Sequence, residues 1–350
     1  MKNTMKKIAA ALTAIALAAS CAACSFSSAT SSAASGAAST AGTTASTAKN
    51  FKIGVIQFAT HPSLANCYNG FKAGLEEAGY KDGGNITIDF QNAQGDTSNS
   101  DLIAKNMVSK KYDLIMGIAT PSAMSAYSAA KSTDIPVVFT AVSDPVAAGI
   151  VKSDDKPGVN CTGSSDVLPL EQQVKMIRAF LPNAKKIGIL YTTSEPNSVS
   201  QLKQIKELAP KYNFEIVDVG VTSASEVAAA AATAVSKGVD CINNFTDNNV
   251  VDNLSTVLQA ANSAKIPVFG SEEEQVKNGC LASQSIDYVA LGKETGKMAA
   301  KILKGEAKAS DTPVYLVKDC TPVYNKAVMD KMGLTLPSEY SKATAVTATK

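Results

Sequence analysis

Between residues 51 and 320 the chain alternates short, apolar, β-prone runs with longer amphipathic segments, and this alternation limits the folds available to it. Strands separated by helices pair in parallel, because parallel neighbours need a long crossover, and helices then cover both faces of the sheet. The first series comprises strands 51–58, 86–90, 113–119 and 135–140 with helices 69–79, 101–110 and 121–131. The second comprises strands 186–191, 215–219, 240–245 and 266–269 with helices near 198–212, 226–237 and 250–263. The sequence therefore predicts an α/β fold with two doubly wound parallel-sheet lobes.

The polar segment 158–169 separates the two series, and too few elements follow them to form a third domain. About 300 residues exceed one ordinary core, which favours two lobes. We therefore expect helix 288–304 and strand 313–317 to complete these two lobes. The expected boundaries are 51–163 plus about 287–309 for the N-terminal lobe, and 164–286 plus about 310–345 for the C-terminal lobe.

The amino terminus has the pattern of an export signal. Three lysines precede an uncharged apolar run over residues 8–19, which is shorter than the roughly 20 residues that span a bilayer. The run ends in Leu17-Ala18-Ala19-Ser20-Cys21, which is similar to a bacterial lipobox. We therefore expect residues 1–20 to be a lipoprotein signal peptide and Cys21 to carry the lipid. Cys24 is the alternative acceptor, and a plain secretory signal is the alternative to lipidation.

Residues 21–49 consist largely of serine, alanine and threonine. Such a segment cannot bury a core, so it predicts a flexible tether. Together with the export signal, the tether indicates an extracytoplasmic protein that an N-terminal lipid anchors to the cell membrane.

Charge and composition disfavour several classes of ligand. The formal charge of +2 becomes −1 without the first 20 residues, since 33 basic residues minus three lysines leave 30 against 31 acidic ones. No basic stripe remains for nucleic acid. Arg178 is the only arginine, and the chain has no tryptophan. The single arginine disfavours a strongly anionic ligand, because arginine forks bind such ligands well. The lack of tryptophan disfavours a sugar held by broad aromatic platforms.

Signals for catalysis or for a cofactor are weak. His61 is the only histidine, and the chain has no dinucleotide-binding, phosphate-loop or paired-histidine motif. We therefore expect neither an enzyme nor a resident metal or cofactor. The odd number of cysteines after the tether, without metal-ligand spacing, predicts buried thiols, with one disulfide as the alternative. These cysteines are Cys67, Cys161, Cys241, Cys280 and Cys320.

Ligands of open parallel sheets bind beyond the carboxyl ends of the strands, so the residues after each strand are site candidates. Strand 113–119 is followed by Thr120, Pro121 and Ser122. We expect Thr120 to be the N-cap and Pro121 the first residue of the helix, which leaves the N–H groups of Ser122 and Ala123 free to bind a carboxylate. The alternative is that Thr120 only caps its own helix.

The other strand ends supply further polar candidates. Ser143 can donate to a carboxylate, whereas Asp144 is a ligand contact or the cap of the next turn. Asp247 is a candidate partner for an ammonium group, with an N-cap as the alternative. The complete set of expected ligand-binding residues is Gln57, His61, Thr120, Pro121, Ser122, Ser143, Asp144, Ser194, Asn197, Ser198, Asp247, Asn248, Ser271 and Asp287. Candidates for stacking on an aromatic ligand are Phe58, Tyr68, Tyr191 and Phe245.

Several of these blocks occur together, in order, over nearly the whole chain beyond residue 50. They resemble the substrate-binding lipoproteins of ABC importers, in the group that includes tryptophan- and tyrosine-binding members. The matching blocks are Gln57, His61-Pro62, 92–96, 119–121, 137–145, 162–166, Ser194-Glu195, Asn197-Ser198 and Asp247-Asn248. One departure is Ala65, where the family often has aspartate after His-Pro-x-Leu.

The resemblance implies a type I periplasmic-binding-protein fold, in which two lobes joined by three hinge crossings close around a small ligand. It implies an amino acid, with aromatic ones among the candidates, whose carboxylate meets the turn from Thr120 to Ser122 and Ser143. Asn197, Ser198 and Asp247 would hold this ligand from the other lobe. The implied partners are an ABC permease and its ATPase, and the protein itself would be a monomer.

Three alternatives remain at this point. A sensor subunit that presents its closed form to a signalling receptor would have the same fold. A transcriptional regulator core would also share the fold, but it should begin with a DNA-binding helix pair in place of the export segment. An extracytoplasmic hydrolase would have to depend on His61.

Overall fold

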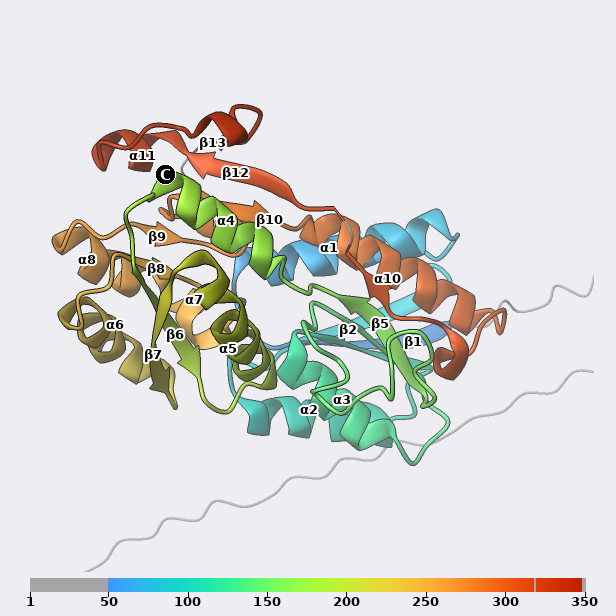
Figure 1. The fold of residues 1–350 in the computed structure, drawn as a ribbon. Coiled ribbons are helices and arrows are strands. Elements are labelled where there is room, and N and C mark those ends of the chain that lie inside the picture. The colour runs from blue at the N-terminus through green and yellow to red at the C-terminus, as the bar shows by residue number, and fades with distance from the viewer. Residues whose placement is uncertain (1–49, 318, 348–350) are drawn as a thin grey trace, which may run out of the picture. The chain divides into compact units, whose positions relative to one another are not determined.

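The computed structural model describes residues 50–317 and 319–347 (Figure 1). The described residues begin at Asn50, directly after the expected tether. They therefore exclude the expected signal peptide, both candidate lipidation cysteines and the expected tether. No helix in the described part of the chain combines the length and the hydropathy that a membrane span requires.

The first sheet has six parallel strands in the order β11-β5-β4-β3-β1-β2. Alternate side chains of each strand point to opposite faces, as strand geometry requires. Helices α1 and α10 lie on one face of this sheet, and α2 and α3 on the other (Figure 1). Val55 and Met116 pack with the first pair, whereas Ile56 and Ile115 pack with the second. The strands are β1 Phe51–Gln57, β2 Ile86–Asn92, β3 Leu114–Ile118, β4 Val137–Thr140, β5 Cys161–Ser165 and β11 Tyr315–Leu316, and the helices are α1 Pro62–Glu77, α2 Thr97–Ser109, α3 Thr120–Ala130 and α10 Tyr288–Leu303.

Glycines let α1 and α10 approach very closely. A Cβ atom on Gly70 would lie 2.0 Å from the carbonyl oxygen of Val289, and one on Gly292 would lie 2.0 Å from that of Cys67. Any larger residue at these positions would force the helices apart. This contact matters for the site because both helices begin beside it.

The second sheet has four parallel strands in the order β7-β6-β8-β9. Helices α4 and α5 pack on one face, where Ile187 and Ile189 point, and α6 and α8 pack on the other, around Leu190 and Ile242. The strands are β6 Lys186–Thr192, β7 Glu215–Val221, β8 Cys241–Asn243 and β9 Val268–Phe269, and the helices are α4 Leu170–Phe180, α5 Pro196–Leu208, α6 Val227–Ser236, α7 Asn248–Asp252, α8 Leu254–Ser263 and α9 Glu273–Lys277.

A small three-stranded sheet extends the second lobe. Strand β10 pairs antiparallel with β12, which pairs parallel with β13. Backbone hydrogen bonds from Leu281 to Val268 and from Gly270 to Ala282 connect this sheet to β9. Its elements are β10 Ala282–Ser285, β12 Thr321–Asn325, β13 Thr344–Val346 and α11 Lys326–Lys331.

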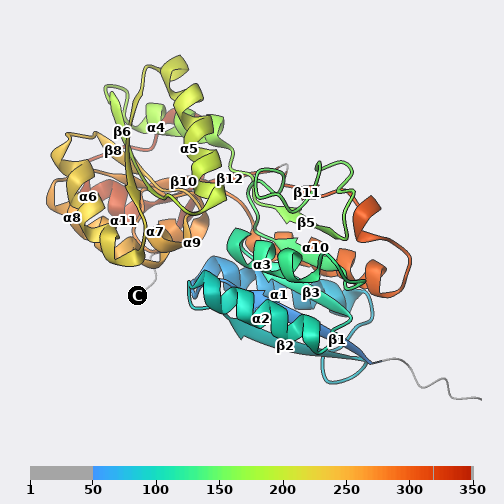
Figure 2. The ribbon, with the colours of Figure 1, turned by 90° about the horizontal axis from the view of Figure 1, so that it is seen from below.

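The expected α/β fold with two parallel-sheet lobes is confirmed, and the chain crosses between the lobes three times (Figure 2). The crossings follow β5, β10 and β11. Because β11 pairs with β5, we propose that the third boundary lies after Leu316, not near residue 310 as the sequence suggested. The five cysteines of the described chain are free, and all except Cys320 are buried, as expected.

Candidate ligand-binding site

A narrow cavity, part of it open to solvent, lies where the carboxyl ends of strands from both sheets meet. This is the position at which open parallel sheets bind ligands. The first lobe contributes His61, Ser63, Leu64, Ala119, Thr120, Ala141, Ser143, Asp166 and Tyr288, and the second contributes Asn197, Thr246, Asn248, Val251, Glu272 and Gln275. The described residues around the cavity include no lysine or arginine, so the only fixed charges are carboxylates.

The amino terminus of α3 reaches this cavity. The expected N-cap was wrong by one residue: Ala119, at φ 75°, is the N-cap and Thr120 is already helical. The N–H group of Ala123 therefore donates to the Ala119 carbonyl at 3.0 Å and is not free. Within the described residues, the N–H groups of Thr120 and Ser122 donate to no acceptor. With the helix dipole, they still provide an end suited to a carboxylate.

Asp166 is the buried acid at the first crossing between the lobes. One of its carboxylate oxygens accepts from the Ser143 hydroxyl at 2.9 Å, and the other accepts from the Tyr288 hydroxyl at 2.8 Å. Burial raises the pKa of Asp166, although these two hydrogen bonds oppose the shift. Ser143 also lies 3.1 Å from the Thr246 hydroxyl, so this group of side chains spans both lobes.

Glu272 is a second buried acid on the cavity wall. Its carboxylate accepts from the N–H groups of Glu274 at 2.7 Å and Gln275 at 2.8 Å, which fixes it as the N-cap of α9. Burial raises the pKa of Glu272 to about 7, against the lowering effect of these N–H groups. Near neutral pH the group can therefore be present in both protonation states.

His61 lines the cavity together with Asn248 of the other lobe. Burial lowers the pKa of His61 to about 4, so the ring is neutral at physiological pH. Its Nδ1 atom has no hydrogen-bond partner among the described residues. Asn197 has an unpartnered Oδ1 atom as well, while its amide nitrogen donates to Glu195 at 3.1 Å and to the Thr246 carbonyl at 3.1 Å.

Asp247 is a structural residue of the second lobe. Its fully buried carboxylate accepts from the N–H group and hydroxyl of Thr192 at 2.5 and 2.8 Å, from the Ser198 hydroxyl at 2.7 Å and from the N–H group of Val250 at 3.0 Å. It caps α7 and does not line the cavity. Of the two interpretations offered by the sequence, the N-cap is the one observed.

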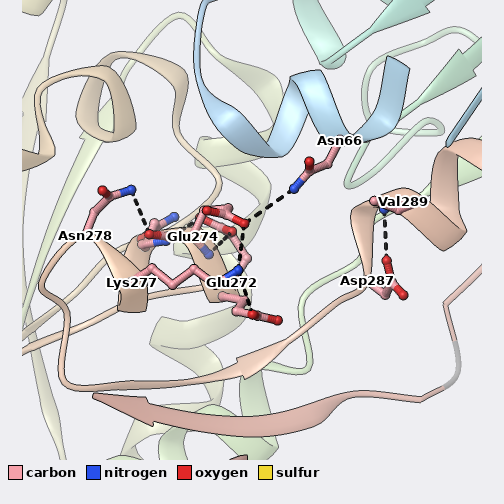
Figure 3. Close-up of polar contacts among 9 residues, drawn as sticks. Asn66, Glu272, Glu274, Lys277, Asn278, Asp287 and Val289 are labelled. Carbon is pink, nitrogen blue, oxygen red and sulfur yellow. Dashed lines mark hydrogen bonds and ion pairs between the residues drawn. The ribbon is translucent and has the colours of Figure 1, made fainter. Parts of the chain in front are cut away.

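Five of the fourteen expected site residues line the cavity, namely His61, Thr120, Ser143, Asn197 and Asn248. Pro121 and Ser194 line an adjoining outer groove. Five others are buried and do not line the cavity, namely Gln57, Ser122, Ser198, Asp247 and Ser271. Asp287 is an exposed N-cap of α10 that accepts from the Val289 N–H group at 2.9 Å (Figure 3). None of the four aromatic candidates lines the cavity.

The sequence did not identify Asp166, Glu272 and Tyr288 as site residues. Asp166 follows a strand, β5, whose Thr-Gly-Ser-Ser sequence resembles a loop, and Tyr288 opens a helix far along the chain. Glu272 directly follows Ser271, which was a candidate, so the strand-end rule pointed to the correct loop but not to the correct residue.

Asp144 caps a turn through the Ala147 N–H group, as one interpretation of the sequence held, and it also joins the lobes. Its other oxygen accepts from the hydroxyl of Ser200 in α5 at 2.7 Å. A second bridge joins Asn66 of α1 to Glu274 of α9 at 3.5 Å (Figure 3). These contacts from both sides of the cavity indicate a closed arrangement of the lobes.

Two parallel-sheet lobes, three crossings and a polar cavity at the strand ends define a two-lobed binding protein with the type I periplasmic-binding-protein fold. The sequence profile of the ABC transporter substrate-binding proteins matches residues 52–347. The chain belongs to this family, whose members work outside the cytoplasm.

Individual relatives agree with this assignment. The chain is 43% identical to the tyrosine-binding protein of Clostridioides difficile, over 82% of each chain. It is 41% identical to a Streptococcus pneumoniae protein solved with L-Trp, which superposes with a TM-score of 0.81 over 85% of this chain and 99% of that one. It is 42% identical to a ligand-free, open substrate-binding protein with adhesive properties from Clostridium difficile, with a TM-score of 0.66 over 85% of this chain and 100% of that one.

Proposed function

We propose that this substrate-binding protein captures a free L-amino acid, with aromatic ones favoured, and presents it in the closed form to an ABC permease and its ATPase. The single observation that carries the proposal is the pairing, in one cavity, of the free N–H group of Thr120 at the start of α3 with a buried carboxylate and no lysine or arginine among the described residues. A zwitterion is the ligand whose two charges complement those two features. The names of the relatives support the aromatic preference.

The α-carboxylate would bind at the start of α3. Thr120 lines the cavity and its N–H group lacks an acceptor, whereas Ser122, whose N–H group also lacks one, does not line the cavity. Because Thr120 is almost fully buried, a ligand carboxylate would meet its N–H group away from competing water. The sequence placed the carboxylate at the N–H groups of Ser122 and Ala123; the start of α3 is kept as the site, with Thr120 as the donor at the cavity.

The ammonium group would bind Asp166, not Asp247. Asp166 lines the cavity and has two donors, whereas Asp247 already accepts four hydrogen bonds inside the second lobe. Asn197 would add its unpartnered Oδ1 atom from the opposite lobe. The ammonium group would then contact both lobes, which makes its binding stronger in the closed form than in the open one.

Closure is the second part of the proposal. A ligand can shift the lobes only as far as its affinity differs between the open and closed forms. Here the wall of the cavity comes from both lobes, so most of that difference arises on closure. The higher TM-score with the L-Trp complex than with the open structure, at the same coverage of this chain, supports a closed state.

Calorimetric titration with the common L-amino acids tests the proposal, with the variant Asp166→Asn as its sharpest arm. We expect Asp166→Asn to weaken amino-acid binding by about 2–5 kcal/mol, because the ligand ammonium would be buried without its counter-charge. Asp218→Asn, in a surface ion pair with Lys206, is the matched control and should leave affinity unchanged. Equal affinities for the wild type and Asp166→Asn would refute the assignment.

The mode of attachment and the partners are also proposals. We infer that the protein is a monomer anchored through lipidated Cys21, with Cys24 as the alternative, because the preceding residues have the pattern of a lipoprotein signal. Metabolic labelling with a fatty acid should then be lost in Cys21→Ser and retained in Cys24→Ser. Copurification with a permease and an ATPase would favour transport, whereas capture by a receptor alone would favour the sensor alternative.

A further inference from the structure

The cavity has a second polar end that the amino-acid backbone would not use. His61, Ser63, Val251, Glu272 and Gln275 line both the cavity and a groove on the outside of the protein, so this end faces the surface. Thr120 and Asp166, which would hold the backbone groups, line only the cavity. A ligand held by its α-carboxylate and ammonium would therefore direct its side chain toward this second end.

The second end of the cavity has unused hydrogen-bonding capacity of its own. Ser63 is 3% exposed and its side chain faces Glu272 closely enough to lower the pKa of that carboxyl, yet its hydroxyl forms no well-aligned hydrogen bond among the described residues. The His61 Nδ1 atom is also unpartnered. Buried polar atoms rarely remain unpaired, because each one loses its hydrogen bonds to water, and such atoms on a cavity wall indicate a ligand with matching groups.

Glu272 is held rigidly enough to recognise such a group. Backbone donors from the first turn of α9 fix its carboxylate, and α9 is joined to α1 by the bridge between Glu274 and Asn66 (Figure 3). Each carboxylate oxygen has further lone pairs that can accept from a ligand. Leu64 and Val251 provide apolar surface on the cavity wall, and Tyr288, which donates to Asp166, lies within electrostatic range of both acids.

We propose that Ser63 and Glu272 form a side-chain subsite that selects an aromatic ring carrying an O–H or N–H donor at its edge, as in a phenol or an indole, and rejects an unsubstituted phenyl ring. The donor would bind the Glu272 carboxylate, and a phenol oxygen would in addition accept from Ser63. A phenyl ring would bury both side chains without partners, and sites built to bind a hydroxyl discriminate strongly against ligands that lack one. This inference rests on the proposed function, because the ligand backbone must be held at the other end.

Calorimetric titrations with L-tyrosine, L-tryptophan, L-phenylalanine, O-methyl-L-tyrosine and 1-methyl-L-tryptophan test the subsite on the unaltered protein. We expect tyrosine or tryptophan to bind at least about 30-fold more tightly than phenylalanine. Methylation removes the donor and keeps the ring, so it should abolish that advantage. Phenylalanine binding as tightly as both donor-bearing ligands would overturn the inference and leave the proposed function intact. The absence of binding by any amino acid would overturn both.

Two variants then identify the residues. Ser63→Ala and Glu272→Gln should each reduce the ratio of tyrosine to phenylalanine affinity by at least about fivefold, while phenylalanine affinity changes little. Glu273→Gln is the matched control, because Glu273 lies in the same helical turn but pairs with Lys277 outside the cavity. An unchanged ratio in both variants would refute the subsite. If Glu272→Gln does not fold, Ser63→Ala and the methylated ligands still decide.

Discussion

At the scale of single residues, the cavity region is dominated by buried acids that lack basic partners. Glu195, next to the cavity wall, accepts three hydrogen bonds on one carboxylate oxygen, from the backbone and side chain of Asn248 and from Asn197, and none on the other. Burial, with the nearby Asp247 charge as a second cause, raises the pKa of Glu195 to about 8. Burial alone would leave such acids protonated, so a ligand cation is the natural means of compensating them.

This predicts a stability that falls as pH rises from 6.5 to 8. Glu195 and Glu272 are largely protonated in the folded protein at the start of this range and ionised in the unfolded chain, so the unfolded state binds fewer protons. His61 opposes this trend weakly, because at pH 6.5 its ring is about half protonated in the unfolded chain and neutral in the folded protein, which amounts to about 0.4 kcal/mol over the range. We expect the free energy of unfolding in urea, without ligand, to fall by about 2 kcal/mol. Glu195→Gln should flatten this slope, and a stability that rises over the range would contradict the assignment.

At the scale of helices and strands, most of the fold was predictable because buried parallel strands are apolar and their helices amphipathic. Strand β5 escaped prediction because its hydroxyls are satisfied inside the protein: Ser164 lies 3.0 Å from Thr140, and Thr162 donates to the Thr312 carbonyl at 2.7 Å. Only tertiary partners make such a sequence a buried strand. The acids of the site were not predicted for the same reason, because no local sequence pattern shows whether a capping carboxylate such as Glu272 also lines a cavity.

The close contact between α1 and α10 also depends on tertiary structure, and it gives a prediction at this scale. Gly292→Ala would place a methyl group against the Cys67 carbonyl, so we expect the free energy of unfolding to fall by about 1–3 kcal/mol. Gly84→Ala is the control, since its Cβ would lie 3.2 Å from the nearest atom, the Lys81 carbonyl oxygen. Equal losses of stability in urea unfolding for the two variants would mean that the helices are not held this close.

At the scale of the whole molecule, the contacts between lobes would set the balance between open and closed forms. The hydrogen bond from Ser200 to Asp144 and the contact between Ser143 and Thr246 lie on the same side of the cavity, and the bridge from Asn66 to Glu274 involves helices on the other. Bonds of this kind exist only when the lobes are closed. Their loss therefore lowers the apparent affinity without removing any contact to the ligand.

Ser200→Ala isolates this effect, because Ser200 does not line the cavity. Loss of its hydrogen bond to Asp144 should weaken amino-acid binding by about 1 kcal/mol, mainly through faster release of the ligand. Stopped-flow fluorescence and calorimetry would measure the two quantities. Ser263→Ala, which removes an exposed hydroxyl bonded within α8, should change neither. A release rate unaffected by Ser200→Ala would show that this bond does not contribute to closure.

The cavity should recognise both charges of a zwitterion, one through the start of α3 and the other through Asp166. Titration calorimetry with L-tyrosine, N-acetyl-L-tyrosine and L-tyrosinamide tests it most directly, because the last two compounds lack the ammonium and the carboxylate respectively. We predict binding of L-tyrosine and a loss of at least about 2 kcal/mol for each derivative. A derivative that binds as tightly as L-tyrosine would contradict the account.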